Sequence, residues 1–380
     1  MHLLHYTRSV RLEAGGPAEG LRREIDGYLH DGHSAEVLTL DPPGDDSGGD
    51  IPVPVHHLGG DGGKYGYSKA VAGWLAANLD RFDGVIVHGL WQFQGWSALR
   101  AIKQPKPYVV FTHGMLDPWF NKTYPLKFAK KLPYWMAIER RVLRGAYRVL
   151  FTSETERDLA AKSFPFSSWT PQIVPYGTSG PPEDEQSQLT AFADACPQVS
   201  GKDFLLFAAR IHEKKGCDLL IEAYGIVSRH LPLPPLVMAG PDQTGLRAKL
   251  EAQANALGIA DRVFWPGMLK GDAKWGAFRA CEAFILPSHQ ENFGIAVAEA
   301  LACGTPVLIS NKVNIWREIE ADAAGYVEND DLAGTTALLK RWVATAPGVR
   351  ATMKENAKEC FARRFEIGEA TDSLLKVLHS

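Results

Sequence analysis

The chain has 380 residues, which is more than one typical domain needs and suits two domains that each bury their own core. Its 41 Lys and Arg residues nearly balance its 44 Asp and Glu residues, and this near-neutral charge argues against nucleic acid as the main partner. The five cysteines form no CxxC pair and include an odd one, which argues against a disulfide framework or a structural zinc site and suits a reducing cytoplasm.

The predicted elements alternate between apolar runs of strand length and helical stretches. Strands are expected at residues 3–6, 35–40, 84–87, 108–112, 148–152 and 172–174, and then at 204–208, 236–239, 262–265, 283–286 and 306–309. This alternation predicts an α/β fold whose parallel sheets are covered by helices on both faces. No stretch approaches about 18 unbroken apolar residues, and residues 1–6 read as a strand rather than a targeting signal, so we expect a soluble or at most peripheral protein.

Two irregular stretches interrupt the alternation. Residues 41–63 are rich in Pro, Gly and Asp and predict a mobile loop of the first half. Residues 177–186 are polar and contain two prolines, which favours a linker. We therefore predict an amino-terminal domain of residues 1–176, a linker of residues 177–200 and a carboxy-terminal domain of residues 201–360.

His-Gly pairs follow two strands of the first half, at His88-Gly89 and His113-Gly114. The carboxyl ends of parallel strands form the ligand crevice of an open sheet, so an imidazole there suits hydrogen bonding to a hydroxyl or a developing charge. The alternative is a histidine that only caps its strand, which is as well supported for His88 and less so for His113. Gly15-Gly16 follows the first strand and by itself reads as a plain loop.

Residues 121–148 combine eight cations with aromatic side chains, and Glu139 is their only acid. One interpretation is a basic, aromatic surface that meets anionic lipid headgroups or a polyprenyl-diphosphate acceptor. The other interpretation, slightly favoured, is ordinary helices whose basic side chains are solvated and whose aromatic side chains belong to the core.

A basic loop follows the first predicted strand of the second half. Arg210 and Lys215-Gly216 stand between the strand at residues 204–208 and a helical pattern that begins near Cys217. Cations at the exit of a parallel strand are placed to neutralise a phosphate. A loop of this kind by itself is usually solvated surface.

A second segment supports the interpretation that Arg210 and Lys215 neutralise a phosphate. Glu291 and Glu299 are eight residues apart and flank the expected start of a helix, so they are placed to hold two parts of one long ligand. Between them, the backbone amides of residues 292–295 carry the positive end of the helix dipole, and Gly294 permits a close approach of the ligand. Ordinary solvated acids are the alternative. The combination with Arg210 and Lys215 favours a site for a sugar attached to a diphosphate.

These segments together resemble the family 4 retaining glycosyltransferases of the GT-B fold. The resemblance covers nearly the whole chain and rests on Arg210, Lys215-Gly216, the run of residues 286–294, Glu299, the segment Ala302-Cys-Gly-Thr-Pro306, and Gly15-Gly16-Pro17. Its most specific part is the Glu-x7-Glu segment with the following Gly-Thr-Pro. It implies two doubly wound parallel-sheet (Rossmann-like) domains facing a central cleft, with residues 361–380 forming a helix that returns to the amino-terminal domain.

The resemblance also implies a role for individual residues. His113 would lie beside the donor sugar, Glu291 would contact sugar hydroxyls, and Arg210 and Lys215 would stabilise the departing diphosphate. The remaining donor site would comprise Gly15, Gly16, Met268, Asn292, Phe293, Gly294, Ile295 and Glu299, with Glu299 on the ribose. The acceptor loops of the first domain would include His88, Trp91 and Asp117.

We therefore predict a retaining glycosyltransferase of the hexosyltransferase class that uses a UDP- or GDP-linked sugar. Its acceptor would be a hydroxyl of a glycan or of a polyprenyl-diphosphate-linked oligosaccharide in surface polysaccharide biosynthesis, in the cytoplasm or at the inner face of the cell membrane. Neither a cofactor nor a metal is expected, because fixed cations and a helix dipole are available to offset the diphosphate charge. A sugar-nucleotide epimerase or a phosphorylase of the same fold is the alternative.

Overall fold

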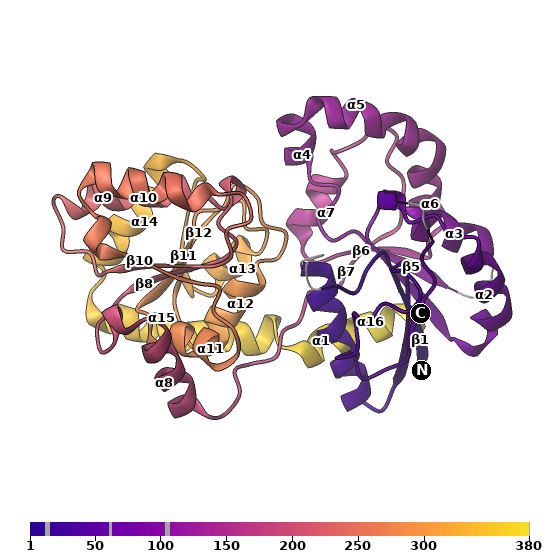
Figure 1. Ribbon diagram of the computed structural model, residues 1–380, viewed down its shortest axis with the longest axis horizontal. Coiled ribbons are helices and arrows are strands. Elements are labelled where there is room, and N and C mark those ends of the chain that lie inside the picture. Colours follow the sequence, from indigo (N-terminus) through magenta and orange to yellow (C-terminus); the bar gives the residue numbers. More distant parts are fainter. Residues whose placement is uncertain (12–15, 61–62, 103–106, 380) are drawn as a thin grey trace. The chain divides into compact units, whose positions relative to one another are not determined.

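The computed structural model describes residues 1–11, 16–60, 63–102 and 107–379 (Figure 1). The chain divides into two compact units. Unit 1 comprises residues 1–177 together with 367–380, and unit 2 comprises residues 178–366. Each unit is a parallel sheet with helices packed on it, as the alternating pattern predicts.

Unit 1 contains a seven-stranded parallel sheet in the order β3-β2-β1-β4-β5-β6-β7. Its strands are β1 (His2–Thr7), β2 (Ser34–Thr39), β3 (Val55–His57), β4 (Gly84–His88), β5 (Tyr108–Phe111), β6 (Arg148–Phe151) and β7 (Pro171–Ile173). Its helices include α1 (Gly16–His30), α2 (Ala70–Asn78), α3 (Phe93–Ala101), α4 (Pro118–Thr123), α5 (Pro125–Tyr134), the π-helix η4 (Trp135–Glu139), α6 (Arg140–Gly145), α7 (Glu154–Ala160) and α16 (Ile367–His379). The strand order reverses between β1 and β4.

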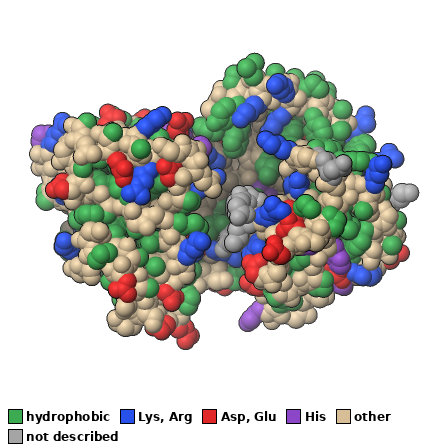
Figure 2. Space-filling model, in the orientation of Figure 1, with side chains coloured by type: hydrophobic (Ala, Val, Ile, Leu, Met, Phe, Trp, Pro, Cys, Tyr) green, Lys and Arg blue, Asp and Glu red, His purple; other side chains and the backbone are tan. Residues whose placement is uncertain are grey.

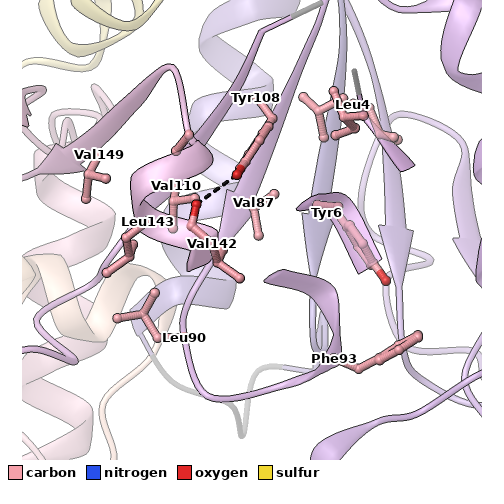
Figure 3. Close-up of a cluster of buried hydrophobic side chains, with 14 of the residues drawn as sticks. Leu4, Tyr6, Val87, Leu90, Phe93, Tyr108, Val110, Val142, Leu143 and Val149 are labelled. Atoms are coloured by element: carbon pink, nitrogen blue, oxygen red, sulfur yellow. Dashed lines mark hydrogen bonds between the residues drawn. The ribbon is translucent and has the colours of Figure 1, made fainter. Parts of the chain in front are cut away.

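Successive residues of the central strands point to opposite faces of this sheet and feed two hydrophobic clusters. Leu4 and Tyr6 of β1 belong to one cluster, in which the hydroxyl of Tyr108 donates a hydrogen bond of 2.8 Å to the carbonyl oxygen of Val142 (Figure 3). Leu3 belongs to the other cluster, which α1 and α16 cover. The last helix of the chain is thus part of the core of unit 1.

Unit 2 contains a six-stranded parallel sheet in the order β10-β9-β8-β11-β12-β13. Its strands are β8 (Leu205–Ala208), β9 (Leu236–Ala239), β10 (Val263–Gly267), β11 (Ala283–Leu286), β12 (Val307–Ser310) and β13 (Gly325–Glu328). Its helices include α8 (Glu185–Ala195), α9 (Cys217–Ser228), α10 (Leu246–Leu257), α11 (Gly271–Ala280), α12 (Ile295–Ala302), α13 (Trp316–Ala321), α14 (Leu332–Ala344) and α15 (Pro347–Arg364). The strand order reverses between β8 and β11, which is where open sheets of this type bind ligands.

All eleven predicted strands coincide with observed strands, but β3 and β13 are not among the predictions. Both are short edge strands with partly exposed side chains, so their sequences lack a continuous apolar run. β3 lies within residues 41–63, which were expected to form a mobile loop without a strand.

The structure also differs from the prediction of a linker at residues 177–200. These residues include α8, which packs on α11 within unit 2. The packing is close because Gly276 of α11 has no side chain: a Cβ there would lie 1.9 Å from the carbonyl oxygen of Gln188. Arg279 adds a hydrogen bond of 2.7 Å to the side chain of Gln188. No helix in the described part of the chain is long and apolar enough to cross a bilayer.

Candidate active site

The loop after β8 carries the predicted cations and packs against the loop after β11. Arg210 is exposed two residues after the strand, and Lys215 is buried in the short helix η6 (Glu213–Lys215). Gly216 follows with a φ of +66°, and a Cβ there would lie 2.1 Å from the carbonyl oxygen of Pro287. Only glycine permits this close approach, which brings the two loops together at the point where the strand order reverses.

Lys215 forms an ion pair with Glu291, the first acid of the Glu-x7-Glu segment. The backbone amide of Glu291 donates a hydrogen bond of 2.9 Å to the carbonyl oxygen of Lys312, which fixes the position of this residue. Burial by itself would raise the pKa of Glu291, but Lys215, Lys214 and Arg210 hold it below its usual value. Glu291 is therefore an ionised hydrogen-bond acceptor at neutral pH.

Helix α12 begins immediately after this pair. Its N-cap is Gly294, with a φ of +80°. The side chain of Asn292 accepts a weak hydrogen bond of 3.4 Å from Asn314, and Phe293 is 3% exposed and packs edge-on against Phe365. In the first helical turn, the amide of Val297 donates a hydrogen bond of 2.7 Å to the carbonyl oxygen of Gly294, and the amino terminus of α12, which begins at Ile295, carries the positive end of the helix dipole.

A pocket with a volume of about 240 Å³ adjoins this helix and lies wholly in unit 2. Three predicted residues line it, Arg210, Met268 and Glu299, and Ala296 contributes from the first turn of α12. Glu299 is 4% exposed and forms an ion pair of 2.8 Å with Lys274, which also lines the pocket. The pocket thus joins a buried acid, two cations and a helix amino terminus, a combination that suits a nucleotide with its phosphates.

Three histidines from neighbouring strands of unit 1 form a hydrogen-bonded row with Tyr176: His5 lies within β1, His88 ends β4, and His113 follows β5. The Nδ1 of His5 lies 2.9 Å from the Nε2 of His88, and the Nδ1 of His88 lies 3.0 Å from the Nε2 of His113. The Nδ1 of His113 is hydrogen-bonded to the hydroxyl of Tyr176. Each shared proton has one donor and one acceptor, so the tautomers of the three rings depend on one another.

Both ring nitrogens of His113 are therefore engaged inside unit 1. Its backbone has a φ of +50°, and the turn that it starts is held by Glu156, whose Oε1 accepts hydrogen bonds of 2.6 Å from Thr112 and 2.7 Å from the amide of Gly114. The row orients this turn at the carboxyl end of β5. The ring of His113 has no nitrogen left for a substrate hydroxyl unless the row rearranges.

His5 and His88 also belong, with Glu24, to the single group in the described residues whose types and spacing suit a metal ion. At 2.9 Å, the two facing nitrogens are at hydrogen-bond distance, and a metal bonded to both at about 2.0–2.1 Å would need an angle near 90° between them. Burial raises the pKa of Glu24 to about 8, so this carboxyl is mostly protonated at neutral pH. The geometry favours the hydrogen-bonded row.

The row predicts a pH dependence of stability. Burial lowers the pKa of His88 to about 3, so the folded protein keeps this ring neutral, while the unfolded chain protonates it below about 6.5. Stability from this group is therefore lost as the pH falls, by about 2 kcal/mol between pH 7.5 and 5. The free energy of unfolding, measured in urea, should differ between wild type and His88→Asn by about 2 kcal/mol less at pH 5 than at pH 7.5. His30→Asn, at an exposed position, is the control. If this difference in free energy of unfolding is the same at both pH values, His88 is not buried in the neutral form.

The remaining predicted residues of unit 1 have different surroundings. Asp117 is 7% exposed and caps α4, where its carboxylate accepts a hydrogen bond of 2.8 Å from the amide of Trp119. Trp91 lines a separate pocket of this unit. Gly16 begins α1, and Gly15 lies outside the described residues.

Both halves of the chain match known protein families. Residues 15–177 match the model of the glycosyl transferase 4-like domain, and residues 194–360 match the model of the glycosyl transferases group 1. The two matches together span most of the chain. This chain belongs to the glycosyltransferase family.

Similar proteins support this assignment. The chain is 28% identical over 250 residues to the D-inositol 3-phosphate glycosyltransferase of Actinosynnema mirum, a match that covers 62% of this chain and 58% of that relative. It spans about half the length of the curated relatives that it matches. Among solved structures, sucrose-phosphate synthase of Thermosynechococcus elongatus has a TM-score of 0.76 at 18% identity and covers 100% of this chain and 98% of its own. HepE of Anabaena in complex with UDP-glucose has a TM-score of 0.73 at 17% identity, with 100% and 99% covered. These similarities confirm the GT-B fold.

Several residues of these candidate sites were not found from the sequence. Lys274 is an ordinary lysine of a helical stretch, and no motif marks it as the partner of Glu299. Gly240 lines the same pocket, and a Cβ there would lie 1.8 Å from the carbonyl oxygen of Ala209. Tyr176 directly precedes the predicted linker, so its contact with His113 depends on the folded sheet. Of these residues, only Gly240 had a signal in the sequence, because a glycine directly after a predicted strand indicates a close approach of the backbone.

Proposed function

We propose that this protein transfers a hexose from a nucleoside diphosphate sugar to an acceptor hydroxyl and retains the anomeric configuration. The main observation behind this proposal is the pocket of unit 2, which Arg210, Lys274 and Glu299 line together with Ala296 from the first turn of α12. Glu291, which forms an ion pair with Lys215, precedes the first residue of α12 by four positions. UDP-glucose bound to HepE supports a uridine nucleotide, and a guanosine nucleotide is the alternative.

In the proposed donor complex, Glu299 binds the ribose and Glu291 binds hydroxyls of the sugar. The diphosphate lies on the amides of residues 292–295, near Arg210 and Lys215, with the base near Met268. The buried position of Glu299 and the ionised state of Glu291 suit these roles, since a carboxylate accepts hydrogen bonds from hydroxyl groups. Gly15, Gly16 and His113 are also proposed donor-site residues on the basis of the family resemblance, and His113 would have to give up a hydrogen bond of the row to bind the sugar.

The proposed reaction breaks the bond between C1 of the sugar and the phosphate oxygen, and the electron pair leaves with the diphosphate. A new bond forms between C1 and the acceptor oxygen on the same face, and the proton of the acceptor hydroxyl passes to the departing phosphate. Negative charge grows on that phosphate in the transition state. Arg210, Lys215 and the amides of α12 stabilise it, and this electrostatic contribution is the largest that these residues offer. No cofactor or metal takes part in the proposal.

The proposed acceptor is a glycan or a polyprenyl-diphosphate-linked oligosaccharide of surface polysaccharide biosynthesis. Unit 1 would supply the acceptor residues, among them His88, Trp91 and Asp117. The curated relative named for D-inositol 3-phosphate favours a second candidate, a small phosphorylated polyol.

Contact with the inner face of the membrane is part of the proposal. Leu126 of α5 is 80% exposed, and the exposed residues Tyr124, Lys127 and Lys130 are close to it in the sequence, so apolar and basic side chains lie together over α4 and α5 (Figure 2). Lys127→Glu together with Lys130→Glu should abolish sedimentation with anionic vesicles at low salt. If the wild-type protein stays in the supernatant under those conditions, the membrane contact is wrong.

The experiment that tests the function is a panel of uridine, guanosine, adenosine and thymidine diphosphates and their sugars, read by thermal stabilisation. A selective shift with one nucleotide supports the donor site and identifies the base. Release of the nucleotide that depends on an acceptor then separates a transferase from an epimerase, which keeps the nucleotide attached. No shift with any nucleotide at millimolar concentration would contradict the proposal.

A further inference from the structure

The chain enters unit 2 between Gly177 and Thr178 and leaves it between Glu366 and Ile367, and we name these two points the crossings. In unit 2, the amide of Thr178 donates a hydrogen bond of 2.9 Å to the carbonyl oxygen of Phe365, and Thr178 and Glu366 form an isolated parallel bridge. In unit 1, a Cβ at Gly177 would lie 2.5 Å from the Cα of Ile367. The two crossings are therefore paired within each unit.

Phe365 also contacts the proposed donor segment, residues 291–295. Its ring packs edge-on against the ring of Phe293, with 5.5 Å between the ring centres and 81° between the ring planes, and both side chains are buried. Phe293 lies between Glu291 and Gly294, the N-cap of α12. One residue thus contacts the donor segment with its ring and holds the first crossing with its carbonyl oxygen.

The surroundings of Phe365 give this contact a firm support. Phe365 follows the last residue of α15, and its amide donates a hydrogen bond of 2.8 Å to the carbonyl oxygen of Phe361. Helix α15 packs on α12, so the helix that begins in the donor segment and the helix that leads to the second crossing lie against each other. Packed helices yield little. The contact between Phe293 and Phe365 is therefore the direct route from the donor segment to the crossings.

We propose that Phe365 is a positioning residue that couples the donor segment to the crossings, so that a bound nucleoside diphosphate reduces local opening at Thr178. A ligand on the amides of residues 292–295 restricts Phe293, and Phe293 restricts Phe365, whose carbonyl oxygen holds Thr178. Coupling of this kind works through local stability and needs no change in the average structure. Because coupling is reciprocal, a change that loosens the crossings also weakens nucleotide binding. The inference rests on the proposed donor site and adds a means of regulating it.

The test is hydrogen exchange of the intact protein, followed by mass spectrometry with and without saturating UDP, or GDP if the thermal panel selects guanosine. We expect the nucleotide to slow exchange at residues 292–296 and, by about fivefold or more, in the peptide that contains Thr178. Exchange within α14 should stay unchanged. Equal slowing in α14 would indicate a general stabilisation of unit 2 and would overturn the inference.

Variants at the two rings make the test specific. Phe365→Leu keeps an apolar side chain and removes the edge-on ring contact, so the nucleotide should still slow exchange at residues 292–296 but change it by less than about twofold at Thr178. Phe293→Leu alters the other ring and should give the same result, which guards against a folding defect in the first variant. Phe192→Leu is the matched control, because Phe192 is a buried ring of unit 2 that packs on Phe204 instead, and it should keep the full response at Thr178.

The outcomes separate this inference from the proposed function. If the nucleotide slows exchange at residues 292–296 of the wild type but not at Thr178, the inference fails and the donor site stands. A response at Thr178 that persists in both Phe365→Leu and Phe293→Leu also overturns the inference. If neither UDP nor GDP slows exchange in the donor segment, the proposed function fails, and with it the basis of the inference.

Discussion

Replacing Lys215 by alanine is expected to lower kcat/KM by about 30- to 1,000-fold, which corresponds to about 2–4 kcal/mol of lost transition-state stabilisation. Lys215 is 7% exposed and already fixed by Glu291 and by the close packing of Gly216, so its charge needs no reorganisation when the diphosphate departs. The loss should appear mainly in kcat, because the charge on the leaving phosphate is larger in the transition state than in the bound donor. Steady-state kinetics with the donor identified by the nucleotide panel measures it.

A structural role for Lys215 gives a different result. If Lys215 only neutralises Glu291, the double variant Lys215→Ala with Glu291→Gln should recover stability and much of the activity, since it leaves no buried unpaired charge. If Lys215 acts on the diphosphate, the double variant stays at least as slow as Lys215→Ala. Lys202→Ala, at an exposed position, is the matched control and should behave as wild type. A near-normal kcat/KM for Lys215→Ala would remove this residue from the site.

Glu299→Ala is expected to weaken UDP binding by about tenfold to 150-fold, the loss of about 1.5–3 kcal/mol that follows removal of a charged hydrogen-bond partner. Glu299 is 4% exposed and paired with Lys274 at 2.8 Å, so the substitution also leaves a lysine without its partner in the pocket. Calorimetry with UDP measures the effect. The diphosphate contacts remain, so some affinity should persist.

Two variants make this result specific. Glu299→Gln keeps an oxygen acceptor at nearly the same place and should recover part of the affinity, whereas a purely steric effect of Glu299→Ala predicts recovery close to wild type. Glu222→Ala, an exposed acid of α9, should leave UDP affinity unchanged. An unchanged affinity in Glu299→Ala would count against contact between this acid and the ribose.

Much of the fold was predictable from the sequence because buried parallel strands are continuous apolar runs. Residues 108–111 and 283–286 are examples that have no exposed position. β3 and β13 were not predicted because an edge strand buries only part of its side chains and therefore lacks a continuous apolar run. Helix α8 was assigned to a linker because the polar segment before it is a strong local signal, while its packing on Gly276 depends on a residue about 90 positions away.

The sequence by itself determined the class of fold and the family, and it indicated Arg210, Lys215, Glu291 and Glu299 as candidate site residues, because short strand–loop–helix segments carry those residues. Only the tertiary structure decided which side chains meet. The pairing of Lys274 with Glu299, the row from His5 to Tyr176 and the contact of Lys131 with the Trp91 ring each join segments far apart in the chain. No local pattern encodes these contacts, since they arise only when the folded sheets bring separate helices, strands and loops together.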